Sequence, residues 1–173
     1  RAISNGKYEA ESVFETNSPS MDIQIASNFE RLVYDLSDCD DNETQKIMTD
    51  IKEEGKYIIP KNKMEKINKD FLSASINEKE VLDIIKEVYT KYDIILDPHS
   101  AIAFGALNKV NIDGNNIILV TAHPCKFPDA IDKSIGIKPD LPNELKYVMD
   151  EKENYDIISN NLNTIKDHIK EKL

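Results

Sequence analysis

The sequence is poor in cysteine, glycine and aromatic residues. Its 173 residues include two cysteines, five glycines and no tryptophan, and aromatic residues make up 7% of the chain. Cys39 and Cys125 have no CxxC spacing and no further partners, which argues against a disulfide framework and against a structural zinc site. The scattered glycines form neither a collagen-like repeat nor a low-complexity segment. We therefore expect an ordinary globular chain with reduced thiols, located in the cytoplasm.

Positive charge and long apolar runs are also scarce. The chain has 22 Lys and Arg against 32 Asp and Glu, a formal net charge of −10 and a pI near 4.8. Because nucleic-acid affinity comes largely from clustered basic residues, we expect no nucleic-acid partner. No apolar run approaches the roughly 20 residues of a membrane helix, and the first twenty residues lack a signal-peptide core. We expect no membrane partner, and we treat residues 1–173 as a single unit.

Apolar periodicity predicts a series of helices connected by short polar turns. Polar residues at 27 and 28, at 77 and at 97 are suited to begin helices, and Gly55 is suited to end one. Less regular alternation suggests short strands at residues 21–25 and 71–76. The expected helices lie around residues 28–36, 41–54, 61–70, 77–92, 98–110, 129–135 and within 154–173.

The most informative stretch is "NNIILVTAHPCKFPDA", residues 115–130. Residues 117–120 are a continuous apolar run bounded by turn signals, which is typical of a strand buried on both faces. Helices before and after such a strand imply an α/β fold, with a layered sheet covered by helices on both faces.

The polar residues that follow this predicted strand could form a binding site or only a capped loop. Ligands of α/β sheets sit beyond the carboxyl ends of the strands, where Thr121, Ala122 and His123 would lie. A Cys125–His123 nucleophile pair would need the two side chains to meet, and Pro124 between them disfavours this. Metal binding by His99, His123 and Cys125 lacks an established spacing, so we expect no metal site.

Two other stretches carry polar residues at expected helix starts. In "SPSMDIQIASNFERL", residues 18–32, Asn28 and Arg31 are three positions apart and share a helix face, close after Asp22. A helix N-terminus is suited to bind an anion, but an ordinary cap and a solvated arginine explain the same pattern. In "LDPHSAIAFGAL", residues 96–107, His99 and Ser100 read as a capping turn before a helix rich in small residues.

These two stretches and "TAHPCKFPDAI", in this order and spacing, resemble the C-terminal third of threonine synthases of the longer, yeast-like branch. The resemblance extends to the opening "RAISNGKY" and so covers nearly the whole chain. It implies the C-terminal part of the large domain of a type II pyridoxal-phosphate (PLP) enzyme. The family converts O-phospho-L-homoserine and water to L-threonine and phosphate, which is a lyase reaction of amino-acid biosynthesis.

The resemblance also implies roles for individual residues. Type II enzymes place a Ser or Thr hydroxyl opposite the pyridine nitrogen of PLP, and the matching position is Thr121. Ala122 and His123 would form the neighbouring wall of the cofactor pocket. The residues implied near the cofactor or substrate are Asp22, Asn28 and Arg31.

The sequence departs from the family at the cofactor anchor. It contains no counterpart of the Ser-Phe-Lys-Asp-like run that carries the PLP-binding lysine, and no Gly/Asn-rich loop for the cofactor phosphate. Its first residue is Arg1 rather than Met. We therefore expect a fragment of threonine synthase that is inactive without an N-terminal portion of the same protein. The alternative is a free-standing, non-catalytic binding or assembly domain derived from a PLP enzyme.

Overall fold

The computed structural model describes residues 2–110 and 112–173. These residues form two compact units, one that extends to Pro139 and one formed by residues 140–173. The expectation that residues 1–173 form a single unit within one large domain stays a prediction.

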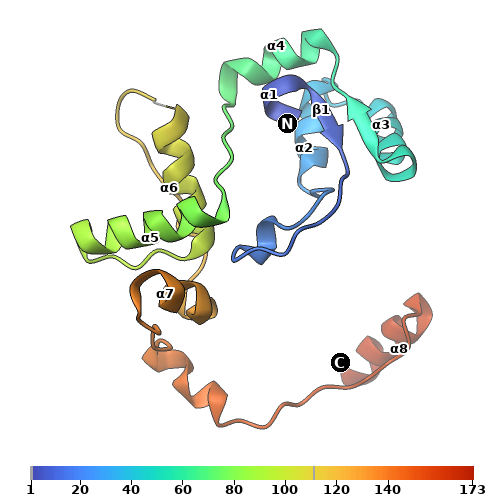
Figure 1. The fold of residues 1–173 in the computed structure, drawn as a ribbon. Coiled ribbons are helices and arrows are strands. Elements are labelled where there is room, and N and C mark those ends of the chain that lie inside the picture. The colour runs from blue at the N-terminus through green and yellow to red at the C-terminus, as the bar shows by residue number, and fades with distance from the viewer. Residues whose placement is uncertain (1, 111) are drawn as a thin grey trace. The chain divides into compact units, whose positions relative to one another are not determined.

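The first unit is mostly helical and contains one small sheet (Figure 1). In chain order its elements are α1 (Ala2–Asn5), β1 (Lys7–Glu9), α2 (Phe29–Leu36), α3 (Asp41–Glu54), β2 (Lys56–Ile58), α4 (Lys61–Asp70), α5 (Glu78–Tyr92), α6 (Pro98–Val110) and α7 (Pro128–Ile135). Two short 3-10 turns, η1 (Pro19–Met21) and η2 (Pro124–Lys126), complete it.

The segment from α1 to α4 packs around the two-stranded sheet. β1 and β2 are antiparallel, with Tyr8 opposite Tyr57. Tyr8 also stacks on Phe29 at the start of α2, with 4.2 Å between the ring centroids, and its hydroxyl accepts a hydrogen bond from the backbone N–H of Ala26. The sheet therefore anchors the loop that leads into α2. The buried apolar residues of this segment are Val33, Leu36, Ile47, Ile51, Ile59 and Ile67.

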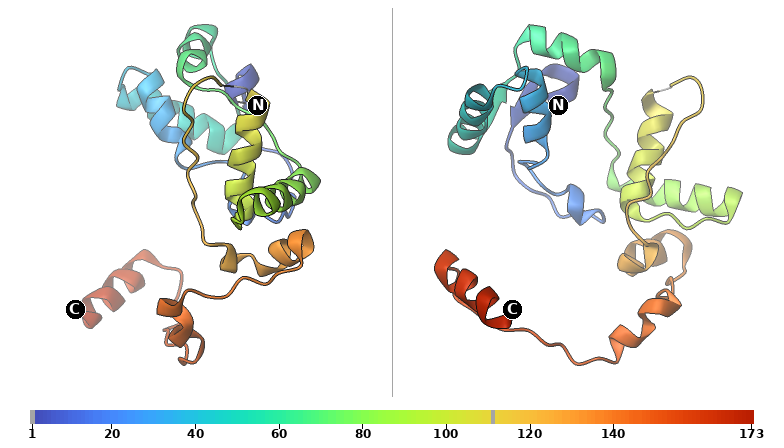
Figure 2. Two further views of the ribbon diagram at one scale, coloured as in Figure 1. Left: turned by 90° about the vertical axis from the view of Figure 1, so that its left-hand side faces the viewer. Right: turned by 180° about the vertical axis from the view of Figure 1, so that it is seen from behind.

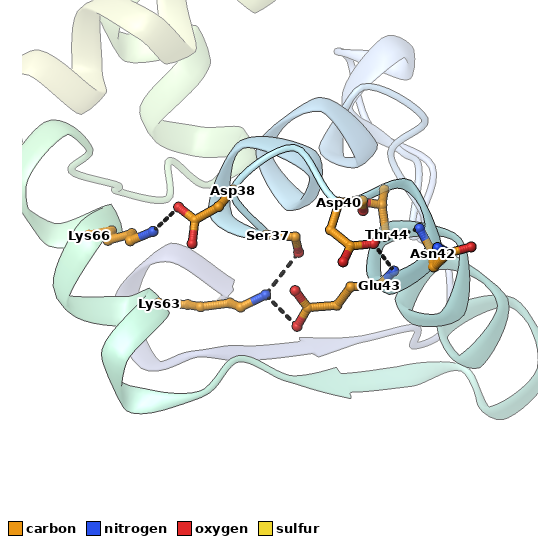
Figure 3. Close-up of polar contacts among 8 residues, drawn as sticks. All are labelled: Ser37, Asp38, Asp40, Asn42, Glu43, Thr44, Lys63 and Lys66. Atoms are coloured by element: carbon orange, nitrogen blue, oxygen red, sulfur yellow. Dashed lines mark hydrogen bonds and ion pairs between the residues drawn. The ribbon is translucent and has the colours of Figure 1, made fainter.

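Two lysines of α4 hold the tight loop between α2 and α3 (Figure 3). The buried Lys63 side chain donates to Ser37 Oγ at 2.8 Å and to Glu43 Oε1 at 2.8 Å. Lys66 donates to Asp38 Oδ1 at 2.6 Å. Asp38 has a φ of 52°, in the left-handed region that non-glycine residues rarely occupy, so these contacts support an unfavourable backbone conformation.

Helices α5, α6 and α7 form a second core, in which α5 contacts both of the others (Figure 1). Asn77 and Glu80 make a complete capping box at the start of α5. Gly105 lets α6 approach α5 closely, as the small residues of this helix predicted. The buried apolar residues of this core are Val81, Ile85, Val88, Leu96, Ala101 and Ile131.

The second unit contains the 3-10 segment η3 (Asn143–Met149) and the helix α8 (Leu162–Lys172). Asn161 caps α8 by accepting hydrogen bonds from the backbone N–H groups of Asn163 and Thr164. The predicted helical region 154–173 is therefore correct only for its C-terminal half, because residues 154–161 are not helical.

The predicted buried strand at residues 117–120 is wrong for this chain. These residues lie in an unpaired segment between α6 and α7, as both views of Figure 2 show. The side chains of Ile117 and Leu119 are 90% and 74% exposed. A strand needs hydrogen-bonding neighbours, and the described residues offer this segment none. Its apolar pattern is that of a strand, but the sheet that would bury it is not formed here.

The predicted short strands at residues 21–25 and 71–76 are also wrong, because neither segment pairs with another strand. The alternating Ile23 and Ile25 are instead 57% and 43% exposed. Alternation indicates a strand only where one side of it is buried. The α/β class is confirmed at the level of a mixed, mainly helical chain with a small sheet.

Candidate functional site

A cavity of about 1150 Å³ opens in the first unit beside α6. Its wall combines the η1 turn, the segment between α4 and α5, one side of α6 and the unpaired segment after it. The lining is largely apolar, with a few polar groups. The lining residues include Ser20, His99, Ile102, Thr121, Ala122 and Phe127.

Thr121 and Ala122 line this cavity, and their contact with a cofactor stays a prediction. The Thr121 hydroxyl has no hydrogen-bond partner among residues 2–110 and 112–173. It is therefore available to a ligand. His123 is not part of the lining, because its Nδ1 accepts a hydrogen bond from the backbone N–H of Cys125 at 3.2 Å and so caps η2.

The His99 side chain, which lines the cavity, has a polar partner at each ring nitrogen. Its Nδ1 lies 3.0 Å from Oδ1 of Asp97, and its Nε2 lies 3.2 Å from the backbone nitrogen of Ser20. Its ring also packs at a tilt against Phe127, with 4.8 Å between the centroids. Asp97 is completely buried, and its other oxygen accepts a hydrogen bond from the Ser100 hydroxyl.

The prediction that His99 belongs to a capping turn is therefore correct, but it did not include the contact of the ring with Ser20. Asp97 does accept the backbone N–H of His99 at 3.0 Å, as a cap would. The contact with Ser20, 79 positions away in the sequence, joins the cap to the cavity wall. No local pattern contains that information. The only signal was the presence of both residues in motifs that resemble one family.

The other candidate residues, Asp22, Asn28 and Arg31, do not line this cavity. The Asp22 carboxylate accepts hydrogen bonds from the backbone N–H and the hydroxyl of Thr16, at 2.8 and 2.7 Å, and so closes a local loop. Asn28 immediately precedes α2, but its side chain makes no capping hydrogen bond. Arg31 lines a separate cavity of about 880 Å³ between α2 and α3. Their proximity to a cofactor or substrate stays a prediction.

The electrostatics of the second cavity are mixed. Glu30, Arg31, Asp41 and Lys52 all contribute to its lining. Repulsion by the negative charges of Cys39 and then Asp41 raises the pKa of the exposed Tyr34 hydroxyl, which also lines it. Opposite charges at one surface do not favour an anion strongly. The cavity beside α6 is therefore the better candidate for a cofactor.

The sequence also raised metal binding and cysteine chemistry as possible functions of the chain. Among the described residues, no group of three His, Cys, Asp or Glu side chains is arranged to hold a metal ion. Cys39 and Cys125 are not joined to each other. Within the same part of the chain, no helix has both the length and the apolar character needed to cross a membrane.

Comparison with known proteins gives the site a family context. Residues 100–169 match the family model described as "Threonine synthase, C-terminal". The chain matches the C-terminal part of threonine synthases. The resemblance inferred from the three motifs is thereby confirmed. The matched residues include most of α6, the segment that contains Thr121 and most of the second unit.

The similarity extends beyond these residues. The threonine synthase of Pseudomonas aeruginosa is 32% identical over 165 residues, which cover 94% of this chain and 35% of that protein. The Saccharomyces cerevisiae enzyme is 34% identical over 172 residues, covering 84% of this chain and 34% of its own length. The chain therefore spans about a third of the curated relatives that it matches.

Two solved structures share the fold. The PLP-bound threonine synthase from Brucella melitensis matches 99% of this chain with a TM-score of 0.84 and 34% sequence identity. The yeast threonine synthase also matches 99%, with a TM-score of 0.79 and 32% identity. The chain covers 37% and 39% of these two structures, respectively. The fold expected from the resemblance is confirmed by both.

Proposed function

We propose that this chain forms the C-terminal part of a threonine synthase, a PLP-dependent lyase that converts O-phospho-L-homoserine and water to L-threonine and phosphate. The observation that carries this proposal is the match of 99% of the chain to a PLP-bound threonine synthase at a TM-score of 0.84. The matched region contains all three motifs of the sequence, and it includes the cavity beside α6. The two free cysteines fit the reducing cytoplasm that we propose as its location.

The cavity beside α6 fits the ring of PLP. Its apolar wall, which includes Ile102 and Phe127, suits an aromatic ring, and the Thr121 hydroxyl supplies a hydrogen-bonding group that no residue of the described ranges engages. We propose that Thr121 hydrogen-bonds the pyridine nitrogen and that Ala122 forms the adjacent wall. His123 would support this wall indirectly, because its side chain caps the adjacent turn η2. When bound, PLP supplies the electron sink that the reaction needs.

Thr121 provides the most direct test of this assignment. In the protein encoded by the complete reading frame, we expect Thr121→Val to weaken PLP binding about 10- to 100-fold, since a lost hydrogen-bond partner at a buried polar atom is worth about 1–3 kcal/mol. Thr121→Ser keeps the hydroxyl and should bind PLP within a few-fold of the parent. Equilibrium titration of the apoprotein with PLP, followed by absorbance, measures both.

The matched change Thr121→Val removes the hydroxyl but keeps the β-branched shape, so packing is preserved. Equal PLP affinities for the Val and Ser variants would show that the hydroxyl does not contact the cofactor. A variant at His123 separates the two roles. His123→Asn retains a cap for η2, and we expect it to leave PLP affinity within about threefold, which is less than one lost hydrogen bond.

The covalent anchor of PLP is proposed to lie outside this sequence. None of the 22 basic residues sits in a run that matches the family's lysine motif. We expect the isolated chain, mixed with PLP and reduced with borohydride, to show only scattered, substoichiometric lysine adducts by mass spectrometry and no turnover of O-phospho-L-homoserine. A stoichiometric adduct on one lysine together with turnover would overturn the fragment assignment.

The complementary N-terminal portion of the same protein is the proposed partner of this chain. The exposed apolar side chains after α6 support this, since large exposed apolar patches mark interaction surfaces. Asp22, Asn28 and Arg31 are proposed for the substrate side of the complete site. Arg31 is exposed and has no carboxylate within ion-pair distance in the described part of the chain.

A further inference from the structure

One long-range polar contact joins the first motif of the sequence to the second. The backbone N–H of Ser20, in the η1 turn, points at Nε2 of His99 at the start of α6, with 3.2 Å between the two nitrogens. Both residues line the cavity beside α6. The contact therefore fixes the position of one part of the cavity wall relative to another.

The two neighbours of the His99 ring determine its tautomer. A backbone N–H can only donate, so Nε2 must present its lone pair to Ser20. The Asp97 carboxylate, 3.0 Å from Nδ1, can only accept from the ring, so Nδ1 carries the proton. Both requirements are met together by the neutral ring protonated at Nδ1. The alternative tautomer would place two donors against each other at Ser20.

Asp97 is built to hold this arrangement. Its side chain is completely buried, and it accepts hydrogen bonds from the His99 backbone N–H, the His99 ring and the Ser100 hydroxyl. It also precedes the N-terminus of α6, where the helix dipole stabilises negative charge. A buried carboxylate with these partners cannot rotate without losing several hydrogen bonds. The orientation of the imidazole is thus fixed by the fold.

We propose that His99 is a positioning residue: held by the Asp97 carboxylate with its proton on Nδ1, it keeps the η1 turn at the wall of the cavity through the backbone amide of Ser20. The role of His99 in holding the η1 turn follows from its contacts with Asp97 and Ser20. Its consequence for substrate binding rests on the proposed threonine synthase activity, because the turn and Thr121 line the same cavity. His99 itself is not assigned contact with the reacting atoms.

Two substitutions separate the two hydrogen bonds of His99. The side-chain amide of Gln reaches the position of Nε2, so His99→Gln keeps an acceptor for Ser20 and loses the donor to Asp97. The amide of Asn reaches only the position of Nδ1, so His99→Asn keeps the donor to Asp97 and loses the acceptor. Amide hydrogen exchange of Ser20 is measured by NMR in the isotope-labelled chain and both variants, with Val81 and Ile85 in the α5 core as references.

We expect His99→Asn to accelerate exchange at Ser20 by about fivefold or more, which corresponds to the loss of one ordinary hydrogen bond, while His99→Gln stays within about twofold of the parent. The reference amides should be unchanged relative to each other. Long-range nitrogen–proton NMR of the parent should show Nδ1 protonated and Nε2 unprotonated. Equal acceleration in both variants, no acceleration in either, or a ring protonated at Nε2 would overturn the proposal.

The consequence for catalysis is measured in the protein of the complete reading frame. We expect His99→Asn to raise KM for O-phospho-L-homoserine about fivefold or more and His99→Gln to restore it to within about twofold of the parent value. Rescue by Gln is not expected of a residue that only fills space. If the parent has no such activity but the exchange pattern holds, the proposed function fails and the positioning contact stands. If the activity is present and Gln does not rescue, the positioning role in catalysis fails.

Discussion

At the scale of single residues, Gly105 shows how one missing side chain permits a helix contact. A Cβ built on Gly105 would lie 2.5 Å from Cδ1 of Ile84 and 3.0 Å from Cδ1 of Ile76. Glycine in a helix interior is about 1 kcal/mol less favourable than alanine, so its presence here needs a compensating gain. Close packing of α6 against α5 provides that gain.

We expect Gly105→Val to lower the free energy of unfolding by about 2–3 kcal/mol, because the branched side chain would overpack the contact with Ile84. Gly105→Ala should lower it less, since the gain in helix propensity offsets part of the clash and the isoleucine ends can move. Urea unfolding followed by circular dichroism measures both. Asn108→Val, at an exposed position of the same helix, is the control for propensity alone. Equal losses at positions 105 and 108 would contradict a packing role.

The two residues of the cavity wall differ in how far the sequence could identify them. The position of Thr121 after an apolar run predicted that it lies at a ligand site, and the resemblance to threonine synthases implied contact with the pyridine nitrogen of PLP. His99 was predicted to lie in a capping turn, which is correct, but one ring nitrogen contacts Asp97, two positions away, and the other contacts Ser20, 79 positions away. Periodicity and capping rules describe residues a few positions apart, so they could not have found Ser20.

At the scale of elements, helices were predicted well because their signals are local. The observed α4, Lys61–Asp70, has the bounds that the sequence predicted, and Gly55 ends α3 with a φ of 71° in the left-handed region. Strands were predicted poorly. β1 and β2 are three residues each and pair across 49 positions between Tyr8 and Tyr57, so their pattern is too short to recognise and their partner is remote.

The capping box at the start of α5 gives a test of a helix signal that the sequence did reveal. Asn77 Oδ1 accepts the backbone N–H of Glu80, and Glu80 Oε2 accepts the backbone N–H of Asn77. We expect Asn77→Ala to lower the free energy of unfolding by about 1 kcal/mol, and Asn77→Ser or Asn77→Asp to change it by only a few tenths. Thermal and urea unfolding measure the difference. A loss with Asp as large as with Ala would point to a packing role for residue 77.

The carboxyl groups of Asp38 and Glu43, which pair with the two lysines of α4, make the stability of the chain depend on pH. The hydrogen bond from Lys63 lowers the pKa of Glu43, and that from Lys66 lowers the pKa of Asp38. Both carboxyls therefore bind protons more weakly in the folded chain than in the unfolded one. Their contribution to stability is complete above their unfolded pKa values of about 4 and is lost as the pH falls through the lower folded values. Urea midpoints measured between neutral pH and pH 3 should fall over this acidic range.

The control for this pH dependence is the double variant Lys63→Met and Lys66→Met. It should be less stable than the parent at pH 7 because Asp38 in the loop and Glu43 at the start of α3 lose their lysine partners, and its urea midpoint should fall less steeply below pH 4.5. The apolar stems of the two lysines are retained by methionine, so packing is largely preserved. An acidic limb with the same slope in parent and variant would show that other carboxyls control the stability.

At the scale of the whole molecule, closed apolar cores contrast with one apolar segment that is exposed to solvent. The cores around α2–α4 and α5–α7 are closed, with residues such as Val81 and Ile85 completely buried. The segment after α6 is the opposite, because the side chains of Ile117, Leu119 and Val120 point largely to solvent. A strand pattern without a sheet, in a chain that spans about a third of its relatives, favours a surface completed by further chain of the same protein.

Hydrogen exchange can show whether residues 116–122 gain strand partners in a longer chain. Peptides that contain residues 116–122 should exchange their amide hydrogens within seconds in the isolated chain and at least about tenfold more slowly in the protein of the complete reading frame, since strand pairing would protect them.

Leu119→Lys should leave the helix content of the isolated chain unchanged, because this side chain supports no described core. In the complete protein it should lower stability by about 2 kcal/mol or more through burial of a charge, while Leu119→Ile should cost less than about 1.5 kcal/mol. A free-standing binding domain predicts otherwise: slow exchange at residues 116–122 in the isolated chain, or no effect of Leu119→Lys in the complete protein, would favour that alternative.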